Sequence, residues 1–260
     1  MSFRHVIALA AVIGAGLAVA AEPPAASSAQ APTSAPTATP SSQPEASQKL
    51  AQTEVAANLN PAAEGAAKGG DATAGQAKAA TCAACHGMDG NPASSQYPKL
   101  AGQHEDYLAR QLGLFKSKHR DNAVMFGFAS PLQPQDMRDI GAFFASKVSL
   151  PGVADAKLVA RGEALYRGGD KGTNLPACMA CHGPDGRGNP GAGYPQLGGQ
   201  YADYVTAKLK DFAAGKGFSD DDHGKIMVTV AKGLSDQDIA ALATYIEGLH
   251  GADAASTAAK

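Results

Sequence analysis

The chain has 260 residues, which allows one large domain or two small ones, and it contains 30 glycines, 16 prolines and no tryptophan. Such a chain has few bulky side chains with which to fill a core. Its 22 basic and 24 acidic residues give a net charge of -2, which argues against nucleic-acid binding. Four cysteines are too few for a disulfide scaffold and lie in two close pairs, a pattern that favours cofactor chemistry.

Residues 1–21 have the three-part pattern of a secretory signal peptide. Arg4 and His5 precede an apolar run over residues 6–20, which small residues close. That run is shorter than the roughly 20 residues of a membrane-spanning helix, so we expect cleavage near Ala20 or Ala21. The pattern predicts an exported, periplasmic protein; retention of the signal is the alternative and would keep the protein at a membrane.

Residues 22–70 consist mainly of Ala, Pro, Ser, Thr and Gln, with hardly a large apolar side chain. Such a stretch cannot bury enough apolar surface to offset the entropy of ordering it. We therefore predict a disordered linker there and a short flexible tail over residues 251–260.

The remaining chain contains an internal repeat. The motif Cys-x-x-Cys-His-Gly at residues 82–87 recurs at 178–183, and the segment Tyr-Pro-x-Leu-x-Gly-Gln at residues 97–103 recurs at 194–200. Further along, Tyr107 matches Tyr204 and Met125 matches Met227. These matches predict two homologous domains, residues 71–150 and 151–250, which meet where Pro151 and Gly152 interrupt the helical pattern.

Each half has the periodicity of helices. Ser235 with Asp238 predicts a capping box before an amphipathic helix, and a matching helix follows Pro134. Opening helices are expected at 74–84 and 159–166, and middle helices at 107–115 and 204–212. Because no convincing strand pattern occurs, we predict an all-α fold.

Cys-x-x-Cys-His is the attachment signature of c-type haem, in which both thiols form thioethers and the histidine binds the iron. The spacing fits about one helical turn, which presents both sulfurs to one porphyrin edge. The pattern therefore predicts two covalent haem groups, on Cys82 and Cys85 with ligand His86, and on Cys178 and Cys181 with ligand His182. A thioredoxin-like pair, half of a zinc site or a disulfide are the alternatives, and the duplication in an exported chain disfavours them. A porphyrin in each half also explains the scarcity of bulky core residues.

A sixth ligand decides whether the iron carries electrons or binds substrate. Thioether sulfur favours ferrous iron and closes the last coordination position. Among six methionines, Met125 and Met227 are the pair that the repeat matches, and we expect both in loops before the closing helices. We predict them as the distal ligands; the alternative is a core-filling role.

Other side chains are candidates for positioning the haem groups. The carbonyls of Pro98 and Pro195 are placed to accept the Nδ1 proton of the two motif histidines. Four further residues are predicted to hydrogen-bond the haem propionates or to pack their own loops: Tyr97, Tyr194, Gln103 and Gln200.

The cations Arg110, Lys116, Lys118 and Arg120 are interpreted as a solvated helix face, with a docking patch or a propionate contact as the alternatives. The run Asp220 to His223 is interpreted as a polar loop rather than a metal site.

Together these motifs resemble the dihaem cytochrome c4 family. The resemblance rests on both haem motifs, both Tyr-Pro segments, the paired methionines and the Ser-Asp-Gln-Asp sequence at 235–238, and it covers residues 73–249. It implies two class I cytochrome c domains related by a pseudo-twofold axis, with haem edges close enough for rapid electron exchange. It also implies periplasmic electron transfer, commonly from a quinol-oxidising complex to a terminal oxidase. The halves differ after the methionines, with Phe-Gly-Phe in one and Val-Thr-Val in the other, so equal haem potentials are not assumed.

A carrier role also follows from the ligands, because a histidine-methionine pair leaves the iron no open site for a small-molecule substrate. The predicted partners are a redox protein donor and acceptor, and the net charges of +1 and -2 on the two halves suggest a different partner for each. Two enzymatic alternatives stay open: a dihaem electron-accepting subunit of a periplasmic dehydrogenase, and a small haem peroxidase. The matched methionines and the lack of a distal His-Arg pair argue against a peroxidase. A gas sensor would need an output domain, and none is visible.

Overall fold

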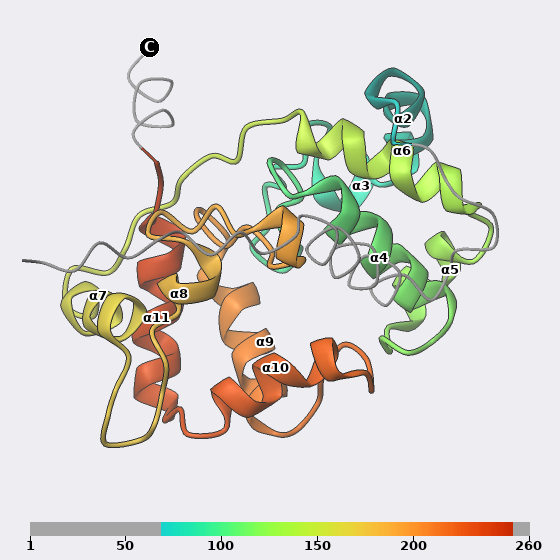
Figure 1. Cartoon of the computed structure of the whole chain (residues 1–260). Coiled ribbons are helices and arrows are strands. Elements are labelled where there is room, and N and C mark those ends of the chain that lie inside the picture. Colours follow the sequence, from blue (N-terminus) through green and yellow to red (C-terminus); the bar gives the residue numbers. More distant parts are fainter. Residues whose placement is uncertain (1–68, 252–260) are drawn as a thin grey trace, which may run out of the picture. The chain divides into compact units, whose positions relative to one another are not determined.

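The computed structural model describes residues 69–251, which belong to one compact unit of the chain (Figure 1). The predicted signal peptide, nearly all of the predicted linker and all but the first residue of the predicted tail lie outside the described residues.

Two sets of helices follow one another along the chain and contain the two haem motifs. The first half contains α2 (Ala72–Lys78), η1 (Ala79–Thr81), α3 (Ala83–His86), α4 (Glu105–Lys116), α5 (Ala123–Ala129) and α6 (Pro134–Ala145). The second half contains α7 (Val159–Gly168), α8 (Met179–His182), η2 (Pro190–Ala192), α9 (Ala202–Ala213), α10 (Asp222–Ala231) and α11 (Asp236–Gly248). Within residues 69–251 strand-like pairing is limited to two isolated bridges, so the all-α prediction is confirmed.

The opening and closing helices of each half cross at a glycine. Helix α6 packs on α2 and α4, and α11 packs on α7 and α9. A side chain at Gly75 would overlap the backbone of Asp139 in α6, and one at Gly162 would overlap the backbone of Ala241 in α11. The two helix pairs therefore approach more closely than any residue with a Cβ atom would allow.

The hydrophobic core of each half is small and lies beside the helix crossing. In the first half Leu108, Ile140, Phe143 and Phe144 are buried together. The second half has a larger cluster around Tyr166 and Leu242, which leave 0% and 2% of their surface exposed. Side chains of both cores also line the cavity described below. A group bound in that cavity would therefore pack against both cores.

Capping side chains set where the helices begin. Ser235 Oγ accepts a hydrogen bond from the backbone N–H of Asp238 at 3.1 Å, which confirms the predicted start of α11. The prediction that both methionines lie in loops is wrong. Met125 lies in α5 and Met227 in α10, because Asn122 and Asp221 cap these two short helices, the former through the N–H of Met125 at 2.9 Å.

None of the helices within residues 69–251 combines the length and the apolar character that crossing a membrane requires.

Candidate functional site

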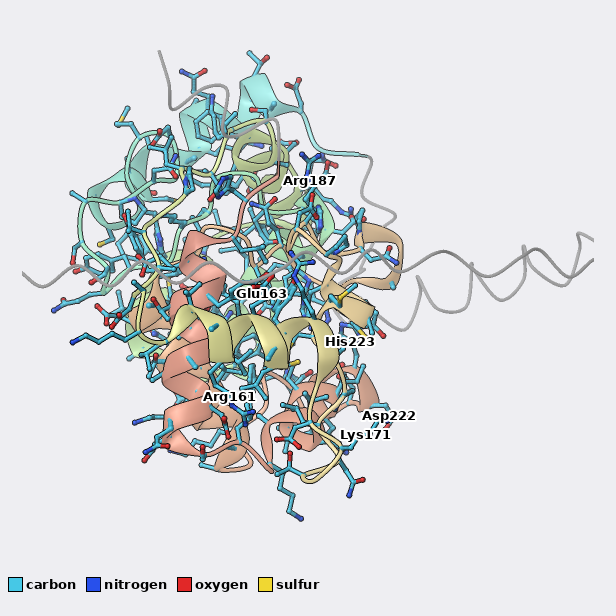
Figure 2. All side chains as sticks on the ribbon, turned by 90° about the vertical axis from the view of Figure 1, so that its left-hand side faces the viewer. Arg161, Glu163, Lys171, Arg187, Asp222 and His223 are labelled. Carbon is cyan, nitrogen blue, oxygen red and sulfur yellow. The ribbon has the colours of Figure 1, made fainter. Side chains whose placement is uncertain are left out.

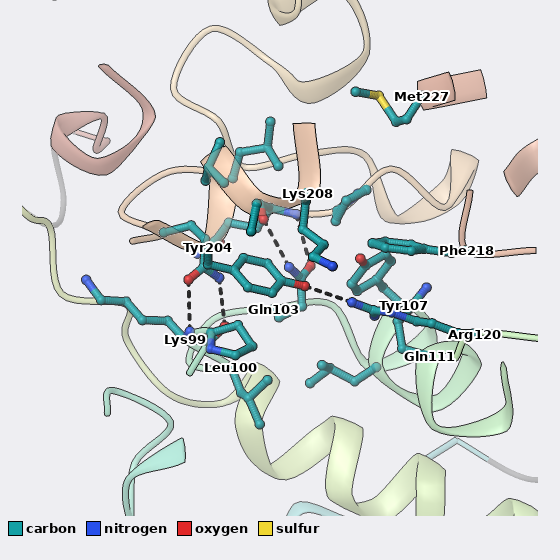
Figure 3. A pocket seen from close by; sticks show the side chains of 18 of the residues that line it. Lys99, Leu100, Gln103, Tyr107, Gln111, Arg120, Tyr204, Lys208, Phe218 and Met227 are labelled. Carbon is teal, nitrogen blue, oxygen red and sulfur yellow. Dashed lines mark hydrogen bonds between the residues drawn. The ribbon is translucent and has the colours of Figure 1, made fainter. Parts of the chain in front are cut away.

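Both haem motifs open into one cavity of about 780 Å³. Side chains from both halves line it, among them Tyr107, Gln111, Arg120 and Tyr204, which Figure 3 shows. The lining includes all eight side chains predicted to attach or ligate haem: Cys82, Cys85, His86, Met125, Cys178, Cys181, His182 and Met227. The structure therefore brings together the residues that the repeat singled out.

The two motif histidines have the same hydrogen-bond geometry. His86 Nδ1 lies 2.9 Å from the carbonyl oxygen of Pro98, and His182 Nδ1 lies 3.0 Å from that of Pro195. These are the two contacts that the sequence predicts. Because a carbonyl oxygen only accepts, Nδ1 carries the proton and Nε2 keeps a free lone pair. Burial lowers the pKa of both imidazoles more than the carbonyl contact raises it, so both rings are neutral metal-ligand donors at pH 7.

None of the four cysteines forms a disulfide with another. Burial raises the pKa of Cys82, and it raises the pKa of Cys178 to about 11. A thioredoxin-like redox pair needs a lowered thiol pKa, which stabilises the reactive thiolate. The environment of the first cysteine in each motif thus argues against that alternative and fits an attachment site.

The methionines occupy equivalent positions on α5 and α10. Met125 and Met227 are both partly buried and both line the cavity. Their helices differ in exposure: Val124 and Phe128 on α5 leave 64% and 44% of their surface exposed, whereas Val228 and Val230 on α10 pack against the core of the second half. The surroundings of the two predicted distal ligands are therefore unequal.

Tyr97 and Tyr194 lie beside the motif histidines. The ring centroids of Tyr97 and His86 are 6.2 Å apart, and those of Tyr194 and His182 are 6.1 Å apart. In the second half Tyr194 also stacks on His223, with a centroid separation of 5.9 Å. Both tyrosines line the cavity, and the predicted propionate contacts stay predictions.

Gln103 and Gln200 join the two halves. Gln103 Oε1 accepts from the backbone N–H of Gln196 at 2.9 Å, and its Nε2 donates to the Gln196 carbonyl at 3.0 Å. Gln200 makes the same pair of bonds to the backbone of Lys99, at 2.9 and 3.0 Å. Since Lys99 and Gln196 occupy equivalent repeat positions, the exchange is reciprocal. Each carboxamide keeps one N–H for the predicted propionate contact, and the sequence did not indicate this interface role.

Lys99 is a buried cation at the same interface, 6% exposed. Its Nζ donates to the carbonyls of Leu150 and Gly199, at 2.5 and 2.7 Å, and lies 4.4 Å from the centre of the Tyr201 ring. Burial lowers its pKa, partly offset by Glu247. Lys99 of the first half therefore binds both the segment that connects the halves, at Leu150, and a loop of the second half, at Gly199.

The interpretation of the four cations as one solvated helix face is wrong for Arg110, which is 9% exposed. Its Nη2 donates to Ser219 Oγ and to the carboxylate of Asp221, both in the second half. Arg120 is half-buried and donates to Gln111 and Tyr204, beside Phe218 (Figure 3).

The two lysines behave differently from these arginines. Lys116 donates to the Leu132 carbonyl at 2.6 Å, whereas Lys118 is exposed and lies over the Phe126 ring. The spacing of these cations predicted a polar helix face, but it could not show that the second half covers the part of that face that contains Arg110.

The acidic run Asp220 to His223 is structural. Asp221 caps α10 and pairs with Arg110, and Asp222 and His223 begin that helix (Figure 2). Among residues 69–251, no cluster of three or more His, Cys, Asp or Glu side chains is arranged to hold a metal ion.

Comparisons with known proteins agree with this geometry. The Cytochrome c family model matches residues 72–147 and 159–250. The chain is 51% identical to cytochrome c4 of Pseudomonas aeruginosa over 181 residues, which cover 70% of this chain and 90% of that protein. The chain belongs to the cytochrome c4 family.

The crystal structure of reduced recombinant cytochrome c4 from Pseudomonas stutzeri matches with a TM-score of 0.67 at 46% identity, over 70% of this chain and 100% of the other. The thiosulfate dehydrogenase electron acceptor of Thiomonas intermedia is 39% identical over 175 residues, which cover 65% of this chain and 78% of that protein.

As a member of this family, the chain carries two covalently bound haem c groups, one in each cytochrome c domain, and transfers electrons to and from protein partners. The residues present fit these groups, because in each half a cysteine pair and a neutral imidazole with a free Nε2 line the same cavity.

Proposed function

We propose that this protein is a periplasmic electron carrier with two closed haem sites, working between a quinol-oxidising complex and a terminal oxidase or reductase. The observation that carries the proposal is the duplicated contact from histidine Nδ1 to the proline carbonyl, at 2.9 and 3.0 Å. It holds both imidazoles in one tautomer and orientation, so little rearrangement accompanies a change of charge at the metal.

Each half contributes a matched set of residues to that function. His86 and Met125 serve as the iron ligands of the first half, and His182 and Met227 as those of the second. When bound, haem c supplies a one-electron couple whose potential a methionine ligand raises. The protein excludes water by enclosing the ligands among apolar side chains, and the paired glutamine contacts keep the two sites at a fixed separation.

The first experiment is a spectrum of the purified, exported protein in both oxidation states, with the haem content per chain and with carbon monoxide added to the reduced form. Two haem groups, a methionine-to-ferric-iron charge-transfer band and no response to carbon monoxide are expected. One haem group, or a carbon monoxide shift in half of the signal, would instead identify an open iron site and support an enzyme or a sensor.

Ligand variants then test the methionine assignment. We expect Met125→Ala and Met227→Ala each to make half of the haem signal responsive to carbon monoxide. Met137→Leu, a buried methionine of α6, is the matched control and should leave both sites closed. A Met125→Ala or Met227→Ala protein that stays unresponsive would overturn the assignment of that methionine.

A second candidate function is that of electron acceptor for a thiosulfate-oxidising enzyme. The likeness to the thiosulfate dehydrogenase electron acceptor supports it. So does a structural match to the Marichromatium purpuratum thiosulfate dehydrogenase, with a TM-score of 0.59 at 31% identity over 68% of this chain and 40% of that chain. Rapid reduction of the purified protein by thiosulfate and a catalytic thiosulfate dehydrogenase would favour this candidate. Reduction only by a quinol-oxidising complex would favour the respiratory carrier.

A further inference from the structure

Two buried hydrogen-bond donors face the cavity without a partner. Within residues 69–251, three buried side-chain polar atoms lack one: His104 Nε2, Arg110 Nε and Gln111 Nε2. Arg110 and Gln111 are neighbours on α4 and line the cavity, whereas His104 does not. A buried donor left unsatisfied costs about 1–3 kcal/mol, so two such donors that line one cavity indicate that the cavity holds a hydrogen-bond acceptor.

The surrounding contacts hold these donors in place. Arg110 is anchored through Nη2 to Ser219 Oγ at 3.1 Å and to Asp221 Oδ2 at 3.1 Å, which leaves Nε directed elsewhere. Gln111 is 4% exposed, and its Oε1 accepts from Arg120 Nη1 at 2.6 Å. That bond identifies the free atom of the carboxamide as the Nε2 donor.

Arg120 is itself fixed from both halves. Its guanidinium carbon lies 4.6 Å from the centre of the Phe115 ring and 3.8 Å from that of Phe218, and its Nη2 donates to Tyr204 at 2.9 Å (Figure 3). Burial and the neighbouring Tyr204 raise the pKa of Tyr107, so that hydroxyl stays protonated beside both arginines. Donors and positive charge are thus concentrated at this boundary, which favours an anionic acceptor.

We propose that Arg110 Nε and Gln111 Nε2 bind a propionate carboxylate of the haem c groups in this cavity, and that Arg110 is thereby a determinant of a haem reduction potential. The inference rests on the proposed function and assigns a positioning role within it. A cation beside the carboxylate disfavours the more positive, oxidised haem and raises its potential.

The second half has no equivalent set of donors. The repeat aligns Arg110 with Ala207, Gln111 with Lys208 and Arg120 with Gly217. Lys208 Nζ bonds Asp211 at 2.5 Å within its own helix. Both arginines that line the cavity within residues 69–251 therefore come from the first half, so the second half has no counterpart to the charge of Arg110.

Variants that remove a positive or a negative charge should shift the haem reduction potential in opposite directions, which tests the proposal. We measure the ratio of reduced to oxidised haem at fixed solution potentials in the full-length, two-haem protein. Arg110→Gln should lower this ratio for at least one haem, on the order of tenfold for loss of a buried unit charge. Asp221→Asn should raise it, because it removes a negative charge while an asparagine still caps α10. Arg110→Lys keeps the charge and should restore most of the ratio.

Two further variants separate the contact from a general disturbance. Gln111→Leu removes a neutral donor of similar size, and it should lower the ratio by less than Arg110→Gln. Arg138→Gln is the matched control, because Arg138 is a first-half arginine paired with Glu105 and Asp106 outside the cavity lining. It should leave both haem steps unchanged.

The failures of the two proposals are distinguishable. A wild-type protein with fewer than two haem groups, or with a carbon monoxide response, contradicts the carrier proposal itself. If the wild type holds two closed haem groups but Arg110→Gln leaves both ratios unchanged, the donors are satisfied by water and the Arg110 inference is wrong. A shift in the same direction for Arg110→Gln and Asp221→Asn would also overturn it, because disruption of the interface would then explain both.

Discussion

The two halves of the molecule are most alike beside the motif histidines and least alike where they meet. The contacts from histidine Nδ1 to the proline carbonyl differ by 0.1 Å between the halves, and so do the separations of the histidine and tyrosine rings. At the interface, by contrast, buried Lys99 stands where the second half has Gln196, and Arg110 stands where it has Ala207. The duplication thus preserved the surroundings of the motif histidines while the interface residues diverged, so any difference in potential between the two sites has its source away from these histidines.

The largest expected effect comes from removing one attachment site at a time. Cys82→Ser with Cys85→Ser should lower the haem content from two groups per chain to one, and Cys178→Ser with Cys181→Ser should do the same. Each half has a small core beside the cavity, so the affected half should also lose helical circular dichroism.

Because the second half has the larger hydrophobic core, we expect it to keep more of its helix than the first half when its haem is absent. Cys82→Ser with Cys85→Ser should cost more helix than the second-half double variant. Met88→Ala, at a 78% exposed position beside the first motif, is the control and should keep two haem groups. Equal haem content in all three proteins would contradict covalent attachment through these cysteines.

The crossing of the opening and closing helices is the next point of comparison. Gly75→Ala and Gly162→Ala each introduce a methyl group that overlaps the backbone of the partner helix, so each should lower the free energy of unfolding by about 1–3 kcal/mol. Gly168→Ala, in the same helix as Gly162 but with open space around it, should have little effect. Thermal and denaturant unfolding of the three variants measure the difference. A stable Gly162→Ala protein would mean that the helices can separate without loss.

The sequence predicted the helices, the repeat and the attachment motifs, because each depends on local spacing. Residues of the interface were harder to assign. Arg110 lies on α4 with the spacing of a polar face, and only the second half, through Ser219 and Asp221, makes that face an interior one. Gln103 and Gln200 were recognised as repeated, but a repeat alone does not distinguish a cofactor contact from a symmetric contact between domains.

The loop prediction for the methionines failed for a local reason. Helices α5 and α10 are short, with seven and ten residues, and several of their apolar residues line the cavity, so few turns are available from which to recognise a helical period. Their capping residues, Asn122 and Asp221, were the signal that could have found them, since both types favour helix starts.

The reciprocal glutamine contacts should make similar contributions from either side. Gln103→Ala and Gln200→Ala each leave a backbone N–H and a carbonyl of the opposite half without that partner, so each should lower the free energy of unfolding by about 1–2 kcal/mol. Gln237→Ala, at an exposed position of α11, is the control. Denaturant unfolding followed separately by haem absorbance and by circular dichroism makes the comparison. A large effect from one glutamine with none from the other would show that the contact is not reciprocal in energy.

The smallest expected effect separates a buried carboxylate in the first half from a carboxylate in the second half whose cationic partner is exposed. Asp139, 3% exposed, accepts from the N–H of Asp71 at 2.9 Å and pairs with Lys78. Burial raises the pKa of Asp139, but the hydrogen bonds from Asp71, Lys78 and Gln135 together lower it by more than burial raises it. The folded pKa therefore lies below the ordinary value. The carboxylate therefore stabilises the fold above the unfolded pKa of about 3.9, and this stabilisation is lost as pH falls through the folded pKa.

Asp139→Asn should accordingly reduce stability at neutral pH, with a difference from wild type that shrinks below about pH 4. The comparison is Asp238→Asn in α11, where the pKa of Asp238 is lowered by the Ser235 hydroxyl and by Arg161, a side chain that is 51% exposed. Salt screens exposed charges more than buried ones, so added salt should diminish the effect of Asp238→Asn and leave most of that of Asp139→Asn. The measurement is the unfolding midpoint of wild type and of both variants at low and high salt, at pH 7 and pH 3. Equal sensitivity to salt would mean that burial and the hydrogen bonds from Asp71 and Gln135 do not protect Asp139 from screening. The Lys78–Asp139 pair would then behave as the Arg161–Asp238 pair does.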